Sequence, residues 1–255
     1  LMRLALIRLG PTAFRFLWTH HHILLDGWSL PLVLREALAH YEAHRRNESL
    51  PLGPARPYRE FVERVGRLDA AAAEAFWRGE LRGFAVATPL GVAPAARTSE
   101  AGHGEVSARL PREATAALRA WARGERLTLN TLVQGAWALV LACHADRDDV
   151  VFGVTVSGRS AGPAGVESMV GLFINTLPLR VRLERHATTR DWLRRLQDRQ
   201  AEARQFEHTP LALIHGWSEI PRGGPLFESL LVFENYPIDR VVPPGAGAGV
   251  RITDT

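Results

Sequence analysis

The sequence predicts a mixed α/β fold, and three kinds of pattern predict it. Residues close to the N-terminus alternate between apolar and polar side chains, as half-buried strands do. Several longer runs repeat their apolar residues at helical spacing. A Val-rich stretch, Asp149 to Val156, is bounded by turn residues and is typical of a buried strand. At 255 residues, the chain is long enough for one large domain or two lobes with their own cores.

The first third of the chain is expected to hold a hairpin followed by a long helix. Residues 2–9 and 13–19 alternate as strands, with Gly10-Pro11 as the turn. An isolated hairpin is barely stable, so further strands are expected beside it. Ser29 is expected to cap the helix that follows it, which ends near Asn47. Its apolar stripe, expected to bury against the sheet, consists of Leu30, Val33, Leu34, Ala37, Leu38 and Tyr41.

The rest of the chain reads as helices and strands separated by one long Gly-, Pro- and Ala-rich segment. We expect residues 1–85 to belong to a first lobe, 86–103 to a linker and 104–255 to a second lobe. In order, the elements expected are an Ala-rich helix through Trp77, a strand near 104–110, a helix after Pro111, an apolar helix from Thr128 to about Cys143, the strand 149–156, an amphipathic helix over 188–206 and a truncated element at 250–255.

Composition excludes several classes of protein. All 31 basic residues are Arg, and the net charge is +4. The densest basic segment, Arg190 to Arg204, also carries three acidic residues, so we expect a solvated helix face and no nucleic-acid partner. No apolar run is long enough to span a bilayer, no leader-like segment opens the chain, and the single Cys143 can form no internal disulfide. A cytoplasmic location without a membrane partner is therefore expected.

The stretch from Trp18 to Ser29 has the highest density of chemically useful residues. An alternating apolar run leads into three histidines, a short apolar spacer, Asp26-Gly27 and a helix start. The pattern His21-His22-x-x-x-Asp26-Gly27 fixes four letters in seven, and a chance match is on the order of one in a thousand at this chain's own residue usage.

This pattern resembles the HHxxxDG core of the condensation domains of nonribosomal peptide synthetases. Trp28-Ser29 matches the form usual in the members that form peptide bonds. Further segments resemble the fourth to seventh motifs of that family in the same order: Tyr58–Val62, Met169–Arg180, Phe206–Pro210 and Pro225–Ser229. The resemblance covers essentially the whole chain. It implies a chloramphenicol acetyltransferase-like, two-lobe pseudo-dimer with a mixed sheet flanked by helices in each lobe, the first lobe being truncated.

The resemblance assigns catalysis to His22. In the family, the second histidine faces a tunnel where a carrier-bound acyl or peptidyl thioester meets the amine of a carrier-bound amino acid. His22 would accept the proton of that amine or orient it, and proximity would supply much of the rate. The implied partners are donor and acceptor peptidyl carrier proteins and an adjacent adenylation domain, in the biosynthesis of antibiotics and other secondary metabolites. The domain itself is expected to bind no cofactor, since the phosphopantetheine arms of the carriers deliver the substrates.

Supporting roles are expected for the other residues of the motif. His21 is expected to pack and hydrogen-bond behind the loop, and Gly27 to supply a permissive backbone. Asp26 would either orient the imidazole, as in a triad, or lock the loop through a buried Arg. The resemblance favours the second role, in which Asp26 pairs with Arg159 and fixes the loop in place; this ion pair is called the lock below. On a strand His20 and His22 would share a face, but a zinc site with Asp26 lacks a second ligand cluster and is opposed by the resemblance, so no metal is expected.

Three residues are weaker candidates for the substrate tunnel. Trp28 follows the motif directly, and Ser157 ends the strand 149–156. Asn175 is a polar amide in an otherwise apolar run, so it must find partners. It would serve equally as a structural tie between the lobes or as a wall of the tunnel.

Three other functions compete with condensation. An epimerisation domain would share the fold, and Glu100 to Glu105 superficially resembles its Glu-Gly-His-Gly-Arg-Glu box, but lacks the Arg and precedes the second lobe's first strand. A non-catalytic platform for carrier proteins or tailoring enzymes usually has a degraded histidine motif, whereas this one is intact. A stand-alone acyltransferase acting on coenzyme A esters would not need the agreement over the later motifs.

Overall fold

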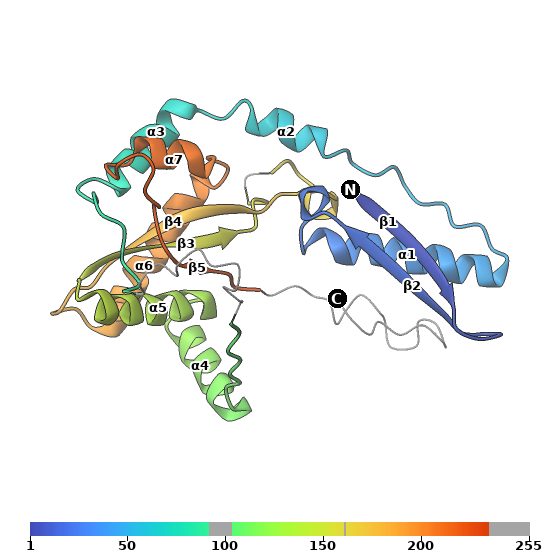
Figure 1. Cartoon of the computed structure of the whole chain (residues 1–255), viewed down its shortest axis with the longest axis horizontal. Coiled ribbons are helices and arrows are strands. Elements are labelled where there is room, and N and C mark those ends of the chain that lie inside the picture. The colour runs from blue at the N-terminus through green and yellow to red at the C-terminus, as the bar shows by residue number, and fades with distance from the viewer. Residues whose placement is uncertain (92–103, 161, 235–255) are drawn as a thin grey trace. The chain divides into compact units, whose positions relative to one another are not determined.

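The computed structural model describes residues 1–91, 104–160 and 162–234, which form two compact units of mixed helices and strands (Figure 1). The first unit combines Leu1–Leu68 with Ser157–Ile174, and the second combines Asp69–Val156 with Asn175–Phe233. Each unit therefore draws on segments that are far apart in the sequence. The expected lobe limits of 85 and 104 stay a prediction.

The first unit opens with the predicted hairpin. Strand β1 (Met2–Arg8) pairs antiparallel with β2 (Phe14–His20), and Leu4 lies opposite Trp18. A 3-10 helix, η1 (His22–Leu24), follows almost at once. Because β2 ends at His20, His22 lies on a helical turn, and the expectation that His20 and His22 share a strand face is wrong.

Residues His21–Asp26 are called the histidine loop below. Helix α1 (Ser29–Arg46) follows this loop and ends at Asn47, which adopts the left-handed conformation. Ser29 is its first helical residue and does not cap it; instead, the Asp26 carboxylate accepts a hydrogen bond from the Ser29 N–H at 2.9 Å. The expected burial of the apolar stripe is only partial, because Leu30, Val33, Leu34 and Leu38 are half-buried, while Ala37 and Tyr41 are exposed.

Short elements complete the first unit and build a small core of its own. Helix α2 (Arg59–Val65) buries Phe61, and the 3-10 helix η2 (Val166–Ser168) buries Val166. These two side chains pack with Met169 and Phe173. This core brings the segment after α1 into contact with residues more than 100 positions later.

The second unit surrounds a three-stranded sheet of order β4-β3-β5. Strand β3 (Asp149–Val156) pairs antiparallel with β4 (Asn175–Arg182) and parallel with β5 (Leu230–Leu231). The other elements are α3 (Ala70–Glu80), α4 (Arg112–Gly124), α5 (Leu129–Ala145), α6 (Thr189–Ala203), η3 (Arg204–Phe206) and α7 (Leu211–Trp217). The hydrophobic core includes Trp77, Leu141, Phe152 and Ile214.

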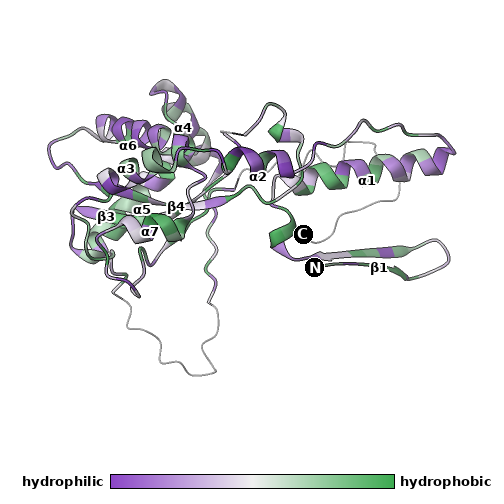
Figure 2. Cartoon of the chain, turned by 90° about the horizontal axis from the view of Figure 1, so that it is seen from above, coloured by the Kyte–Doolittle hydropathy of each residue, from purple (hydrophilic) through white to green (hydrophobic). Residues whose placement is uncertain are grey.

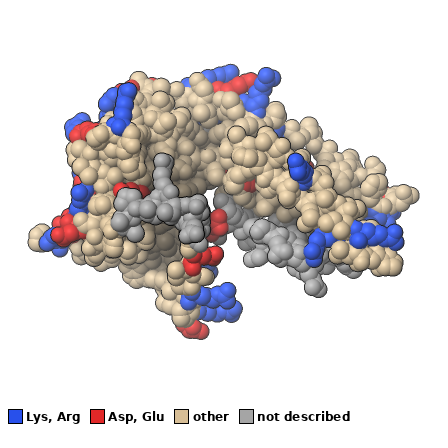
Figure 3. Space-filling model, in the orientation of Figure 1, with Lys and Arg blue, Asp and Glu red and all other residues tan. Residues whose placement is uncertain are grey.

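Side-chain caps explain where three of these helices begin. Asp69 accepts hydrogen bonds from the N–H groups of α3, Thr128 caps α5, and Thr188 caps α6. Figure 2 shows the difference between the largely apolar α5 and the polar α6. The arginines of α6 pair with acidic residues, for example Arg194 with Glu125 at 3.0 Å, and basic and acidic groups are intermixed on the face in Figure 3. The amphipathic helix and its solvated face agree with the sequence prediction.

One expectation for the second unit needs correction. Residues 104–110 form no strand, because they pair with none of the described strands, and Val106 is almost fully exposed. Near the start of the expected linker, Thr88 is buried and its hydroxyl accepts a hydrogen bond from the Val151 N–H at 2.8 Å. Residues 92–103 and the element expected at 250–255 lie outside the described residues.

No single helix of the described ranges is long and apolar enough to cross a membrane. Among the helices of the described ranges, α4 and α5 counted together, across a bend of 106°, meet the required length and composition.

Candidate functional site

The histidine loop presents His22 to the surface. His22 is exposed, and its imidazole forms no hydrogen bond or ion pair with the described residues. His21 holds the turn locally, because its Nδ1 accepts a hydrogen bond from the Ile23 N–H at 3.1 Å. The hydrogen bond expected of His21 is therefore present, although the side chain is exposed rather than packed. Among the described residues, the His22 imidazole therefore differs from that of His21 in having no such contact.

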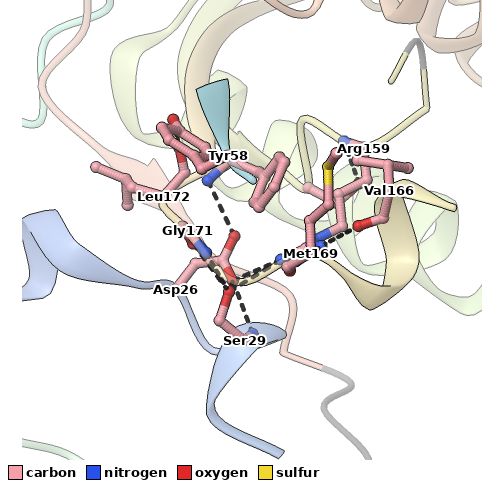
Figure 4. Close-up of polar contacts among 10 residues, drawn as sticks. Asp26, Ser29, Tyr58, Arg159, Val166, Met169, Gly171 and Leu172 are labelled. Carbon is pink, nitrogen blue, oxygen red and sulfur yellow. Dashed lines mark hydrogen bonds and ion pairs between the residues drawn. The ribbon is translucent and has the colours of Figure 1, made fainter. Parts of the chain in front are cut away.

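The Asp26 carboxylate is buried and fully engaged (Figure 4). Its Oδ1 accepts hydrogen bonds from the Ser29 N–H at 2.9 Å, the Ser29 hydroxyl at 2.8 Å and Arg159 Nη2 at 3.1 Å. Its Oδ2 accepts from the Phe173 N–H at 3.1 Å. The ion pair between Asp26 and Arg159 predicted from the resemblance is present. Because these groups occupy the carboxylate, the geometry favours the lock over a triad-like role.

Both terminal nitrogens of Arg159 donate to acceptors of the same compact unit. Its Nη1 donates to the backbone carbonyls of Val166 at 2.6 Å and Met169 at 3.1 Å, and its guanidinium lies 3.8 Å from the centre of the Phe173 ring. Gly158, directly before it, has φ +65°, and a Cβ there would lie 1.7 Å from the Phe173 carbonyl oxygen. The turn before Arg159 thus requires glycine.

An aromatic wall encloses the ion pair. The Tyr58 hydroxyl donates to the Leu172 carbonyl, and the Tyr58 ring stands edge-on to Phe173 with centroids 5.0 Å apart. A Cβ on Gly171 would lie 2.2 Å from the Tyr58 ring, so the segment passes close beneath it. Burial raises the pKa of the Tyr58 hydroxyl above 10.0, the negative charge of Asp26 raises it further, and Arg159 partly offsets both. The Asp26 side chain is fully buried and that of Arg159 is 10% exposed, so removing either partner would leave the other as an unpaired buried charge.

Sequence reasoning missed Ser29, Tyr58 and Gly171 as parts of this site. The signal for Tyr58 and Gly171 was present, because both lie in segments that resemble family motifs, but no pattern tells which atoms meet. Gly27 lies in the turn as expected, yet it is not among the glycines with positive φ. The permissive backbone expected of Gly27 stays a prediction.

The tunnel candidates have ordinary structural contacts. In the second unit, Asn175 Nδ2 donates to the carbonyls of Glu207 and Thr209, both at 2.8 Å, and so ties the start of β4 to the turn after η3. Ser157 Oγ accepts from the Arg159 N–H at 3.5 Å, and Trp28 is 37% exposed. A role of these three residues in a tunnel stays a prediction.

Within residues 1–91, 104–160 and 162–234, no group of three or more His, Cys, Asp or Glu side chains is placed to hold a metal ion. The zinc site considered for His20, His22 and Asp26 is not assembled, because Asp26 is committed to Arg159 and Ser29. Most of the Glu100–Glu105 segment lies outside the described residues.

A fold of two mixed α/β units and a histidine loop locked by a buried ion pair agree with the comparison to known families. The sequence model of the condensation domain matches residues 1–245. The chain therefore belongs to the condensation-domain family.

Its relatives include large peptide synthetases. The chain is 49% identical over 246 residues to a linear gramicidin synthase protein of Brevibacillus parabrevis and 37% identical over 243 residues to bacitracin synthase 3 of Bacillus licheniformis. These matches cover 95% and 94% of the chain, but only 3% and 4% of the relatives. The chain thus corresponds to a small part of multidomain synthetases.

Solved structures show the same fold. The X-domain from teicoplanin biosynthesis aligns with a TM-score of 0.71 at 24% identity, covering 90% of this chain and 54% of that one. The first condensation domain of the calcium-dependent antibiotic synthetase aligns with a TM-score of 0.67 at 22% identity, covering 92% and 53%. The chain has the chloramphenicol acetyltransferase-like fold of these structures, and it spans about half of their length.

Proposed function

We propose that the protein containing this chain forms an amide bond between a carrier-bound acyl or peptidyl thioester and the amine of a carrier-bound amino acid. The observation that carries the proposal is the exposed His22 beside an intact Asp26–Arg159 lock, within a chain of the condensation-domain family. The proposed partners are a donor carrier protein, an acceptor carrier protein and an adenylation domain. The multidomain relatives support these partners.

In this reaction the acceptor amine attacks the thioester carbon, the C–N bond forms and the C–S bond breaks. The amine loses a proton, and the released thiolate gains one. His22 contacts the attacking amine, accepts its proton and returns a proton to the leaving sulfur, because imidazole exchanges protons readily near neutral pH. Asp26 and Arg159 hold the loop and do not touch the reacting atoms. The thioester is already activated, so holding the two substrates together supplies much of the acceleration.

The test is a reconstitution with the intact protein. Carrier proteins loaded with radiolabelled aminoacyl donors are mixed with carriers loaded with unlabelled aminoacyl acceptors, across a panel of amino acids. The expected product is a dipeptide attached as a thioester to the acceptor carrier. Failure to form it across the panel, with both carriers loaded, would overturn the proposal.

The same reconstitution separates the rival functions. Exchange of deuterium at the α-carbon without amide product would indicate epimerisation. Carrier binding without any change in the loaded groups would indicate a docking platform. Acyl transfer from soluble coenzyme A esters, with carrier-bound donors inactive, would indicate a stand-alone acyltransferase.

A further inference from the structure

The Ser29 hydroxyl uses its whole hydrogen-bonding capacity inside the buried lock. Its side chain is completely buried, and Oγ lies 2.8 Å from Asp26 Oδ1 and 2.9 Å from the Gly171 carbonyl, its two possible acceptors. It accepts from Arg159 Nη2 at 3.0 Å and from the Gly171 N–H at 3.1 Å. A hydroxyl has one donor and two lone pairs, so no capacity is left. Ser29 therefore belongs to the lock as fully as the charged pair does (Figure 4).

These contacts join the end of the histidine loop to a distant segment at two places. Asp26 ends the loop, whereas Arg159 and Gly171 lie 130 and 142 residues after Ser29. The Asp26 N–H also donates to the Gly171 carbonyl at 3.0 Å. Without the hydroxyl, the Gly171 N–H would have no other acceptor among residues of the described ranges, and Arg159 Nη2 would keep only Asp26. The contact between loop and segment would then loosen, since a buried unpaired donor costs free energy.

The loop that carries His22 is short and held at both ends. At its start, the His21 N–H donates to the Leu1 carbonyl at 2.7 Å. At its end, Leu25 is buried and Asp26 is fixed by Ser29, Arg159 and Gly171. A shift of Asp26 is therefore transmitted over four residues to His22. A displacement of about 1 Å at a reacting group can lower rates by roughly 100-fold.

We infer that Ser29 is a positioning residue for the histidine loop: its buried hydroxyl sets where His22 meets the acceptor amine. The inference rests on the proposed amide-forming function and assigns to Ser29 a role beyond starting α1. Its consequence is kinetic, because a displaced imidazole lowers the rate of the bound complex while the surfaces that bind the carriers are unchanged.

The test compares Ser29→Ala with Ser218→Ala in the intact protein. Ser218 is a matched control, because its hydroxyl lies in the second unit, donates to the His215 carbonyl at 2.8 Å and accepts from the Ile220 N–H at 3.3 Å. For Ser29→Ala we expect kcat for amide formation to fall at least about 10-fold, which equals about 1.4 kcal/mol of activation free energy, with KM for the acceptor carrier unchanged. Hydrogen exchange should accelerate in peptides covering 169–173 and 24–30, and Ser218→Ala should keep its kcat.

Four outcomes would overturn the inference. One is an unchanged kcat per folded molecule, and another is a rise in KM at constant kcat. If Ser29→Ala does not fold, Ser29→Cys keeps the shape with a weaker hydrogen-bonding group and should lower kcat in the same way. A folded Ser29→Cys variant with the original kcat is the third, and unfolding of both variants is the fourth. If the unsubstituted protein itself makes no amide, the proposed function fails, whereas an active protein indifferent to Ser29 refutes only this role.

Discussion

The strongest stability prediction concerns Asp26→Ala. The substitution removes a completely buried carboxylate that accepts hydrogen bonds from Ser29, Arg159 and Phe173, and leaves the Arg159 side chain, only 10% exposed, without its counter-ion. Breaking a buried ion pair on one side costs about 3–5 kcal/mol. Total stabilities are about 5–15 kcal/mol, so we expect misfolding or a much lower yield of folded protein.

Hydrogen exchange as a function of urea measures this loss locally, in peptides covering residues 21–30 and 166–174. The free energy of opening there should fall by about 3–5 kcal/mol. Asp69→Ala is the control, because Asp69 is an exposed helix cap with two backbone donors, and losing such a cap costs about 1 kcal/mol. A loss at Asp26 no larger than at Asp69 would refute the buried lock. A well-folded but inactive Asp26→Ala would instead support the triad-like role.

Two further substitutions test the surroundings of the lock. Gly158→Ala forces a Cβ to 1.7 Å from the Phe173 carbonyl oxygen at φ +65°. It should therefore lower the free energy of opening by at least about 1–3 kcal/mol. The control is Gly53→Ala, which has open space around it and should leave this free energy unchanged. Equal effects of Gly158→Ala and Gly53→Ala on the free energy of opening would contradict the close contact at Gly158. The pKa of Tyr58 is raised, so its contribution to stability is full below pH 10.0 and is lost as the pH rises above it. The difference between spectrophotometric titrations of the protein and of Tyr58→Phe should show one phenol ionising above pH 10.0; a midpoint at or below this value would contradict the burial.

Local structure could be predicted well from the sequence, because its causes are local. Alternation predicted the hairpin, and Thr128 marked the start of α5. The strand expected at 104–110 failed for a non-local reason, since a strand needs a partner and none of the described strands pairs with it.

In the candidate site, too, features with local causes could be predicted from the sequence, whereas contacts between distant residues could not. A hydroxyl before a helix is a common cap, so Ser29 was expected to serve α1 alone; its actual partner Gly171 lies 142 residues away. The pairing of Asp26 with Arg159, across 133 residues, came from the family resemblance and from no periodicity. Asn175 was recognised as an amide in need of partners, but the carbonyls it meets lie 32 and 34 residues later. Contacts of this kind depend on the folded chain.

The most direct test of the central claim is the single-turnover rate of amide formation by His22→Ala, with His40→Ala, an exposed histidine on α1, as the control. We predict a loss of at least about 100-fold for His22→Ala, the usual contribution of a general base, with an unchanged melting temperature and a normal rate for His40→Ala. A His22→Ala variant that is folded and forms the amide at the original rate would contradict the account, as would a rate loss explained entirely by unfolding.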